Sequence, residues 1–255
     1  MSGTVEGKAE ELADLQSRTS RAGLAENRPG GNTDRGQTKG PRAAGPAGRV
    51  FLGLTHYPIQ NKRREIVATS ITNLDIHDIS RLAATYDLKK YFLIHPHPSQ
   101  RKLVGELLEF WRQGYGGEYN PDRREALERV ALIESIAAAE DWIRGSFGGP
   151  VVKVVTDAHI NPETVSYAEL RRLIWQGPGP AAAERGETGP EAKIAALASG
   201  APVNYLLLFG TGHGLAPEVM ESADLVLAPI LGLGQYNHLS VRSAAAIILD
   251  RLLGS

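Results

Sequence analysis

Short apolar runs alternate with amphipathic stretches from residue 49 to the end of the chain. Compact apolar runs, typical of buried strands, occur at 50–54, 66–71, 91–94, 151–155 and 203–209, with shorter ones at 130–133 and 225–227. Apolar positions spaced about 3.6 residues apart predict helices at 74–83, 99–112, 123–129, 135–144, 167–175, 217–222 and 240–253. Strands that alternate with helices predict an α/β fold, in which helices cover both faces of a mostly parallel sheet.

Two segments interrupt this alternation. Residues 1–48 are rich in Gly, Arg, Glu, Thr and Pro, and contain almost no large apolar side chain after Leu24. Such a segment cannot bury enough surface to offset its chain entropy, so we predict a disordered tail over residues 1–48. Glycines and prolines recur after residue 176, which predicts a flexible insertion at 176–200. The folded domain is expected to span 49–255.

Composition narrows the chemistry. The chain has no cysteine, which excludes disulfides, thiolate metal sites and cysteine nucleophiles. Lys and Arg number 28 against 29 Asp and Glu, so an RNA site has to come from local clusters. The candidates are Lys62-Arg63-Arg64, Arg123-Arg124 and Arg171-Arg172, although each is also typical of a solvated face.

Other site types find little support. His95-Pro96-His97 resembles a metal pair, but the proline prevents helical i, i+4 spacing and no third ligand is nearby, so we expect no metal. A Gly-x-Ser-x-Gly nucleophile elbow does not occur. No apolar run reaches 18 residues and no secretory signal is evident, so we expect no membrane partner and a cytoplasmic protein.

A glycine-rich loop follows the apolar run 206–209. Three glycines in five positions, Gly210-Thr211-Gly212-His213-Gly214, let the backbone adopt positive φ and approach a ligand closely. In parallel sheets ligands sit outside the carboxyl ends of the strands, which is where this loop is expected. A tight turn without a ligand is the alternative. The spacing does not fit a dinucleotide fingerprint, and no Lys-Ser/Thr pair follows as in a P-loop.

Two more strand ends attract attention. The loop at 229–238 leads into a helix whose start is rich in small residues, and Asn237 or Ser240 is expected to cap that helix. Thr156-Asp157-Ala158-His159 follows the run at 151–155, and an ordinary loop is an equally good reading of it.

The last fifty residues resemble the C-terminal motifs of SPOUT RNA methyltransferases. The resemblance is carried by 206–215, 217–224, Pro229-Ile230 and the run from Tyr236 to Val241. Residues 49–254 as a whole are similar to a bacterial SPOUT family of S-adenosylmethionine (SAM)-dependent RNA methyltransferases, with further support from 68–79 and 115–121. The resemblance implies SAM as cofactor, RNA as substrate, a homodimer and a C-terminal trefoil knot, which the general rarity of knots would never suggest.

The resemblance also places the cofactor. It implies contacts with SAM from two loops and the end of one strand, through Thr156, Leu208, Phe209, Gly210, Thr211, Gly212, His213, Gly214, Ile230, Leu239 and Ser240.

The catalytic residues transfer less completely. The SpoU branch of the superfamily carries Asn-x-Gly-x-x-x-Arg-x-Ala, whereas residues 75–83 keep the arginine, Arg81, and the alanine but replace the Asn and Gly. The glutamate of that branch's glycine loop is also missing. We expect Arg81 to hold phosphate or stabilise negative charge, with Asn237 or His238 at the target atom. An ordinary surface arginine is an equally good interpretation of Arg81.

Two other functions remain open. A non-catalytic module of the same fold would bind SAM or RNA without transferring a methyl group. A nicotinamide-dependent oxidoreductase would be stabilised by NAD instead of SAM. The sequence does not name the RNA, the nucleotide or the atom modified.

Overall fold

The computed structural model describes residues 45–255 except 160, 162, 180–188, 199 and 235. All but the last four residues of the predicted tail therefore lie outside the described residues, as does the middle of the predicted insertion. The fold presented here is that of the unit that spans residues 44–255.

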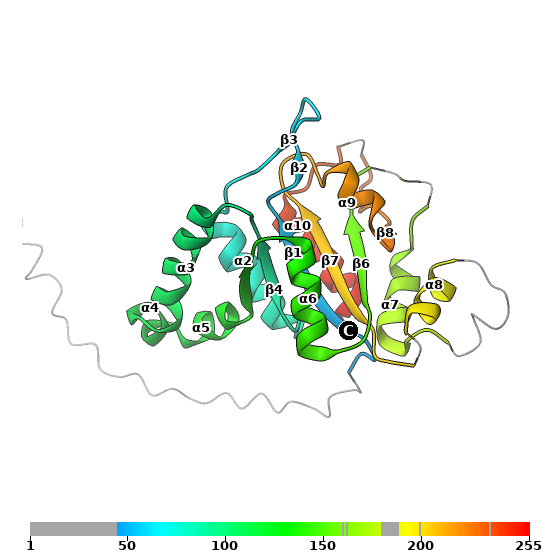
Figure 1. The fold of residues 1–255 in the computed structure, drawn as a ribbon, viewed down its shortest axis with the longest axis horizontal. Coiled ribbons are helices and arrows are strands. Elements are labelled where there is room, and N and C mark those ends of the chain that lie inside the picture. Colours follow the sequence, from blue (N-terminus) through cyan, green and yellow to red (C-terminus); the bar gives the residue numbers. More distant parts are fainter. Residues whose placement is uncertain (1–44, 160, 162, 180–188, 199, 235) are drawn as a thin grey trace, which may run out of the picture. The chain divides into compact units, whose positions relative to one another are not determined.

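Six strands form one sheet in the order β5-β4-β1-β7-β6-β8 (Figure 1). Every neighbouring pair in it is parallel, which confirms the prediction of a mostly parallel sheet. The two central strands, β1 and β7, are buried over nearly their whole length, as expected for strands covered on both faces. The strands are β1 (Arg49–Thr55), β4 (Tyr91–Ile94), β5 (Val130–Ile133), β6 (Val151–Thr156), β7 (Asn204–Gly210) and β8 (Leu225–Leu227).

Helices cover both faces of this sheet, as predicted. Alternate side chains of β1 enter two separate cores: Leu52 lies in one and Phe51 in the other. The first core is closed by α2 (Asn73–Thr85), α3 (Pro98–Arg112), α5 (Pro121–Glu128), α7 (Tyr167–Gln176), α8 (Pro190–Ala198) and α10 (Val241–Leu253). The second is closed by α6 (Ile136–Phe147) and α9 (Pro217–Glu221). The C-terminal helix α10 packs against α2 and α7. The trefoil knot stays a prediction.

Helix α2 begins one residue earlier than expected. Its N-cap is Thr72, whose hydroxyl oxygen accepts from the Asp75 backbone N–H at 3.2 Å. The same hydroxyl donates to the Asp75 carboxylate at 2.6 Å. Asp75 thus lies in the first turn, where its negative charge favours the positive end of the helix.

The prediction of a buried strand at 66–71 is wrong. Only β3 (Ile66–Val67) forms there, and it pairs with β2 (Ile59–Gln60) in an antiparallel hairpin outside the main sheet. Ile66 is 42% exposed. An apolar run of this length is typical of a buried strand, but here the neighbouring turn at residues 61–65 holds the run in a projecting hairpin.

Two helices occur where none was predicted. The glycine-rich segment around 114–117 forms α4 (Tyr115–Tyr119), in which Gly117 packs so tightly on the carbonyl of Trp111 that a side chain would not fit. Within 176–200 the structure contains α8, whose Ile194 and Ala198 are buried in the first core. The glycines and prolines around this helix predicted a loop, although the helix contains a short run of apolar residues that the core buries.

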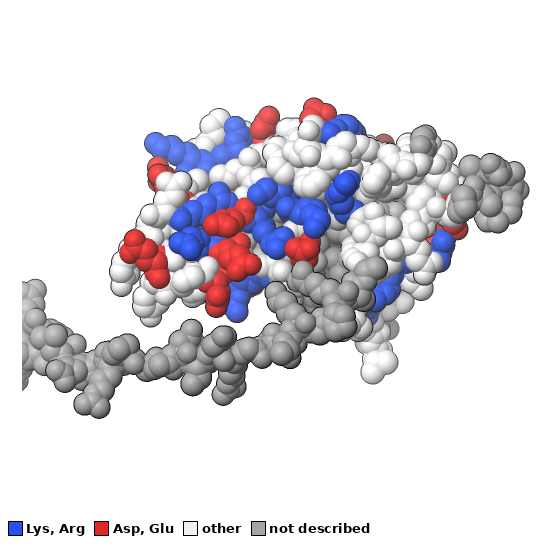
Figure 2. All heavy atoms as spheres, turned by 90° about the horizontal axis from the view of Figure 1, so that it is seen from below, with Lys and Arg blue, Asp and Glu red and all other residues white. Residues whose placement is uncertain are grey.

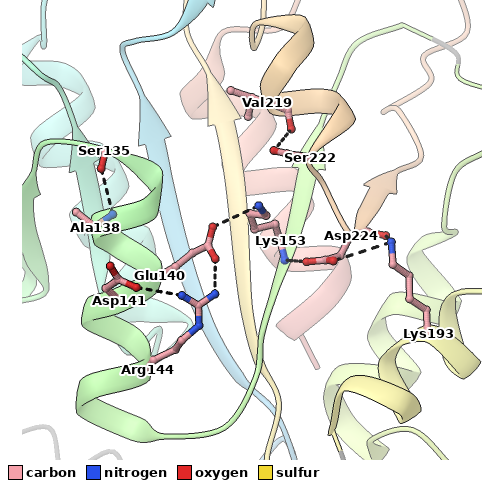
Figure 3. Close-up of polar contacts among 10 residues, drawn as sticks. All are labelled: Ser135, Ala138, Glu140, Asp141, Arg144, Lys153, Lys193, Val219, Ser222 and Asp224. Atoms are coloured by element: carbon pink, nitrogen blue, oxygen red, sulfur yellow. Dashed lines mark hydrogen bonds and ion pairs between the residues drawn. The ribbon is translucent and has the colours of Figure 1, made fainter.

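A polar network joins α6, β6, α8 and the turn before β8 (Figure 3). Lys153 of β6 reaches Glu140 of α6, with 3.3 Å between Nζ and Oε1, and its backbone N–H donates to the Asp224 carboxylate at 2.8 Å. Lys193 of α8 donates to the Asp224 carbonyl oxygen at 2.9 Å. Partly exposed ion pairs each contribute little, but the backbone bonds fix β8 at the edge of the sheet beside β6.

Candidate functional site

The carboxyl ends of the strands meet at one edge of the sheet, from which the β2–β3 hairpin projects (Figure 1). Because all six strands are parallel, the loops after β1, β4, β6, β7 and β8 all leave from this edge. This is the edge at which open α/β sheets bind ligands.

The glycine-rich loop after β7 is bonded to the hairpin. The Gln60 backbone N–H donates to Gly214 O at 2.9 Å, and the His213 N–H donates to Gln60 O at 3.0 Å. A Cβ on Gly210 would lie 2.7 Å from the Leu215 nitrogen, so that glycine allows the loop to fold back on itself. Gly212 has φ +61° and lies against Gln60. Close packing, within the loop at Gly210 and on the hairpin at Gly212, thus accounts for two of the three glycines.

Gly214 differs from these two. Its φ is +106°, which L side chains rarely adopt, yet the space beside it is open. Leu208 and Phe209 point away from the edge, because their buried side chains belong to opposite cores. Thr156 is half-buried and its hydroxyl donates to Leu208 O at 3.1 Å. At 208 and 209, then, the side chains are not available to a ligand.

The loop between β8 and α10 is much less bonded. Among the described residues, no backbone N–H from Ile230 to Leu239 donates a hydrogen bond. Four large apolar side chains in it are exposed: Leu231, Leu233, Tyr236 and Leu239. Globular proteins pair most of their backbone groups and rarely gather exposed apolar residues. Both features indicate a surface that contacts a ligand or another chain.

The end of this loop is fixed by two side chains. Ser240 is the N-cap of α10 and accepts from the Ser243 N–H at 3.2 Å, which confirms one of the two expected caps. The other candidate, Asn237, does not cap; its amide donates to Ala158 O at 2.6 Å and ties the loop to the segment after β6. His238 is exposed, with its ring 5.3 Å from that of Tyr236.

Arg81 lies on the exposed face of α2. One turn earlier on the same helix, Asp78 accepts from the guanidinium of Arg242 at 2.8 Å, and Asp75 lies 3.8 Å from it. Arg242 stands in the first turn of α10, immediately after the exposed loop. Sequence reasoning missed this ion pair, although two carboxylates spaced i, i+3 signalled a common partner.

A chain of polar side chains links the ends of β1 and β7, buried at Thr55 and His56 and half-buried at Thr69 and Thr211, and sequence reasoning missed it as well. Thr211 donates its hydroxyl proton to Thr55 O at 3.2 Å. Thr69 Oγ1 lies 2.6 Å from Thr211 Oγ1, and His56 Nδ1 lies 3.1 Å from Thr69 Oγ1. A hydroxyl carries one proton, so Thr69 donates to Thr211 and accepts from the Nδ1–H of His56. This assigns the proton of neutral His56 to Nδ1.

Burial explains the protonation state of His56. The residue is fully buried, and this desolvation lowers its pKa from 6.5 to about 4, against the smaller opposing effect of the Asp75 carboxylate. Its Nε2 is buried without a hydrogen-bond partner among the described residues, as is the hydroxyl of Thr55. A neutral imidazole and two threonines therefore hold the glycine-rich loop against β1.

His95, the residue after β4, holds Thr69 in place from the other side. The His97 backbone N–H donates to His95 Nδ1 at 3.1 Å, so the ring proton is on Nε2, which donates to Thr69 O at 3.1 Å. Burial is the main cause that lowers the pKa of His95. Within the part of the chain that the structure describes, no group of three or more His, Asp or Glu side chains is placed to hold a metal ion.

An open cavity of about 320 Å³ lies between the hairpin and the glycine-rich loop. Thr69 lines it, so the cavity adjoins the chain of polar side chains that runs from His56 to Thr211. Its other lining residues are Gln60, Asn61, Lys62, Arg63, Glu65, Val67, Gly212 and His213.

None of the helices in the described residues has the length and apolar character needed to cross a bilayer.

Comparison with known proteins gives a family. A model of SAM-dependent RNA methyltransferases matches residues 49–182 and 180–254. A tRNA (guanine-N(1)-)-methyltransferase of Nitratidesulfovibrio vulgaris is 41% identical over 91% of this chain. The chain spans only 44% of that relative and 43% of its counterpart in Oleidesulfovibrio alaskensis. An uncharacterized protein of Aquifex aeolicus is 36% identical over 80% of this chain and 87% of its own length.

Solved structures of similar arrangement were also found. The SpoU methyltransferase AviRb of Streptomyces viridochromogenes, crystallised with AdoMet, has a TM-score of 0.43 and 15% identity, covering 82% of this chain and 61% of that one. A TrmH/SpoU tRNA modifying enzyme of A. aeolicus has a TM-score of 0.42 and 13% identity, covering 80% and 73%.

Proposed function

We propose that this chain transfers a methyl group from SAM to an RNA nucleotide without a further domain. The chain belongs to the family of SAM-dependent RNA methyltransferases. The observation that carries this proposal is the loop between β8 and α10. In its described residues the backbone N–H groups from Ile230 to Leu239 donate no hydrogen bonds, although the loop stands at the ligand-binding edge of the sheet. Free donors there suit a polar cofactor.

The residues fit SAM mainly through their backbone. Ile230, Leu239 and Ser240 would contact it from the later loop, and Gly214 leaves open space on the facing side. Thr156, Leu208, Phe209 and the remaining glycine-loop residues, Gly210, Thr211, Gly212 and His213, would complete the pocket. SAM, when bound, supplies a methyl group on a positively charged sulfur. The chain's task is then to orient the target atom and to manage its proton.

His238 and Arg81 are the proposed catalytic residues. The His238 imidazole is exposed just after the proposed cofactor loop, and its ring nitrogens form no hydrogen bond among the described residues, so it can accept a proton from the target atom. Arg81 is exposed on α2, where a planar guanidinium can hold a phosphate of the substrate. Asn237 we now assign to positioning, because its amide is already bonded to Ala158.

We further propose a homodimer, formed through the exposed apolar residues of the same loop. Leu231, Leu233 and Tyr236 are each more than 60% exposed, a concentration that a second copy would bury. Leu233→Glu should convert the dimer to a monomer in light scattering at micromolar concentration, whereas Leu103→Glu, at an exposed leucine of α3, should not. A monomeric wild-type chain would contradict this part of the proposal. The RNA substrate and SAM imply a cytoplasmic location.

The substrate nucleotide is left open. The chain spans less than half of the relatives named for guanine N1 methylation of tRNA, so their name does not assign that activity to the matched part. Comparing modified nucleosides of tRNA and ribosomal RNA from a deletion strain and its parent identifies the product. A nucleoside that disappears on deletion and returns when purified protein and SAM are added is the expected result.

Two measurements separate an enzyme from a non-catalytic module of the same fold. Calorimetry with SAM and with its demethylated product should show binding, and radiolabelled SAM should label RNA from the deletion strain. His238→Ala and Arg81→Ala should keep cofactor affinity and lose transfer by roughly 10- to 1000-fold. Cofactor binding with no labelled RNA would establish the non-catalytic module, and no binding at millimolar SAM would refute both the enzyme and a SAM-binding module.

A further inference from the structure

The β2–β3 hairpin carries three consecutive exposed cations at its turn. Lys62, Arg63 and Arg64 are all exposed, and among the described residues none of their side chains forms an ion pair or hydrogen bond. The hairpin projects beyond the carboxyl edge of the sheet (Figure 1). Its cations are therefore available to a partner that approaches this edge.

In each of the other two basic clusters, at least one cation is engaged within the protein. Arg171 lies over the ring of Trp175 at 5.3 Å, and Arg172 pairs with Glu191. Arg123 lies over the ring of Trp111 at 4.6 Å. On the face opposite the hairpin, cations and carboxylates are interleaved (Figure 2). Of the three clusters seen in the sequence, the hairpin turn is thus the one whose charges are wholly free.

The turn is held in a defined shape. Asn61 organises it: its side-chain oxygen accepts from the N–H groups of Arg63 at 2.8 Å and Glu65 at 3.0 Å, and its amide donates to the Glu65 carboxylate at 2.6 Å. Arg64 has φ +62°, a left-handed conformation that residues other than glycine rarely adopt. A long cationic side chain occupies a position where glycine would be conformationally easier, which points to use of that side chain.

The base of the hairpin connects the cations to the proposed cofactor loop. Gln60 exchanges backbone hydrogen bonds with His213 and Gly214. The cavity of about 320 Å³ lies between them, with Lys62 and Arg63 on its hairpin side and Gly212 and His213 on its loop side. That volume is at the lower end of small-molecule pockets, which suits one nucleoside. Enzymes that modify a base commonly extrude it into such a pocket.

We propose that the hairpin is an RNA-docking arm, whose three cations hold backbone phosphates while the nucleoside to be methylated enters the cavity at its base. This inference rests on the proposed function, because it assigns the substrate side of the same site. Phosphate contacts position an RNA without reading its sequence, and they make binding depend on salt.

The test compares two triple variants of the full chain. K62Q/R63Q/R64Q removes the arm's charge, and K89Q/K102Q/R144Q removes the same formal charge from cations that already pair with carboxylates. The probes are bulk tRNA and, separately, ribosomal RNA from the deletion strain. Filter binding across a salt series gives the slope of log affinity against log salt, and calorimetry gives the affinity for SAM.

The arm variant should reduce the salt slope by about 2 to 3, roughly 0.7 to 0.9 for each lost phosphate contact, while the control changes it little. Its affinity for SAM and its melting temperature should match those of the wild type, and its KM for RNA should rise with kcat retained. Equal slopes in the two variants, or no RNA bound by the wild type, would overturn the arm. If the wild type binds RNA through the arm but transfers no methyl group, the arm stands and the proposed enzyme fails.

Discussion

Protonation of His56 should weaken the fold as the pH falls. Its pKa is 6.5 in an unfolded chain and about 4 in the folded one, so between these values the unfolded chain binds a proton that the folded chain does not. Stability is therefore unaffected by His56 above pH 6.5 and is lost as the pH approaches 4. From pH 7 to pH 4.5 the linkage relation gives a loss of about 2.5 kcal/mol for this residue alone.

His56→Asn isolates this effect. An asparagine amide can replace the Nδ1–H that donates to Thr69, but it does not titrate. Urea unfolding of both proteins between pH 7.5 and 4.5 gives the free energy of unfolding at each pH. We expect the wild type to lose about 2.5 kcal/mol more than His56→Asn across that range, because other titrating groups, including His95, are common to both. Parallel pH profiles would falsify the assignment of a neutral, buried His56.

Three further substitutions test the loops. Gly212→Ala should cost about 1 to 3 kcal/mol and weaken binding of demethylated SAM in calorimetry, because its Cβ would press on Gln60 at a φ of +61°; Gly145→Ala, in open space on α6, should do neither. Ser240→Ala should lower stability by about 1 kcal/mol in urea titrations through loss of the α10 cap. Asn237→Ala should reduce the rate of methyl transfer while changing the melting temperature little. Unchanged transfer would show that its bond to Ala158 matters only for stability.

The fold could be predicted because most elements are long and strongly periodic. The runs that became β1, β4, β6 and β7 had no competing interpretation, and their alternation with helices required a parallel sheet. Failures occurred where local pattern and tertiary context disagreed. Residues 66–71 are apolar enough for a core strand, yet only β3 forms, and it stays outside the main sheet. Residues 190–198 became helical in a segment where glycine and proline suggested none.

The candidate site was predicted in part. The glycine-rich loop and the Ser240 cap were visible because glycine runs and capping residues are local signals. The chain from His56 through Thr69 to Thr211 was not, because its members lie 13 and 142 residues apart and meet only when the sheet forms. One signal was present: Thr55-His56 directly follows the first apolar run, at a strand end of the kind that binds ligands in parallel sheets.

The two loops at the ligand edge differ in how complete they are, and this difference assigns their tasks. The loop at 210–214 has its backbone bonded to β1 and to the hairpin, and the His56 chain holds it from below. Few of its donors remain for a cofactor, so we infer that it contributes shape. The described residues of 230–239 leave their backbone donors free, so we infer that this loop supplies most of the hydrogen bonds. Cofactor specificity should then reside in the later loop, although the glycine-rich loop is the more conspicuous sequence motif.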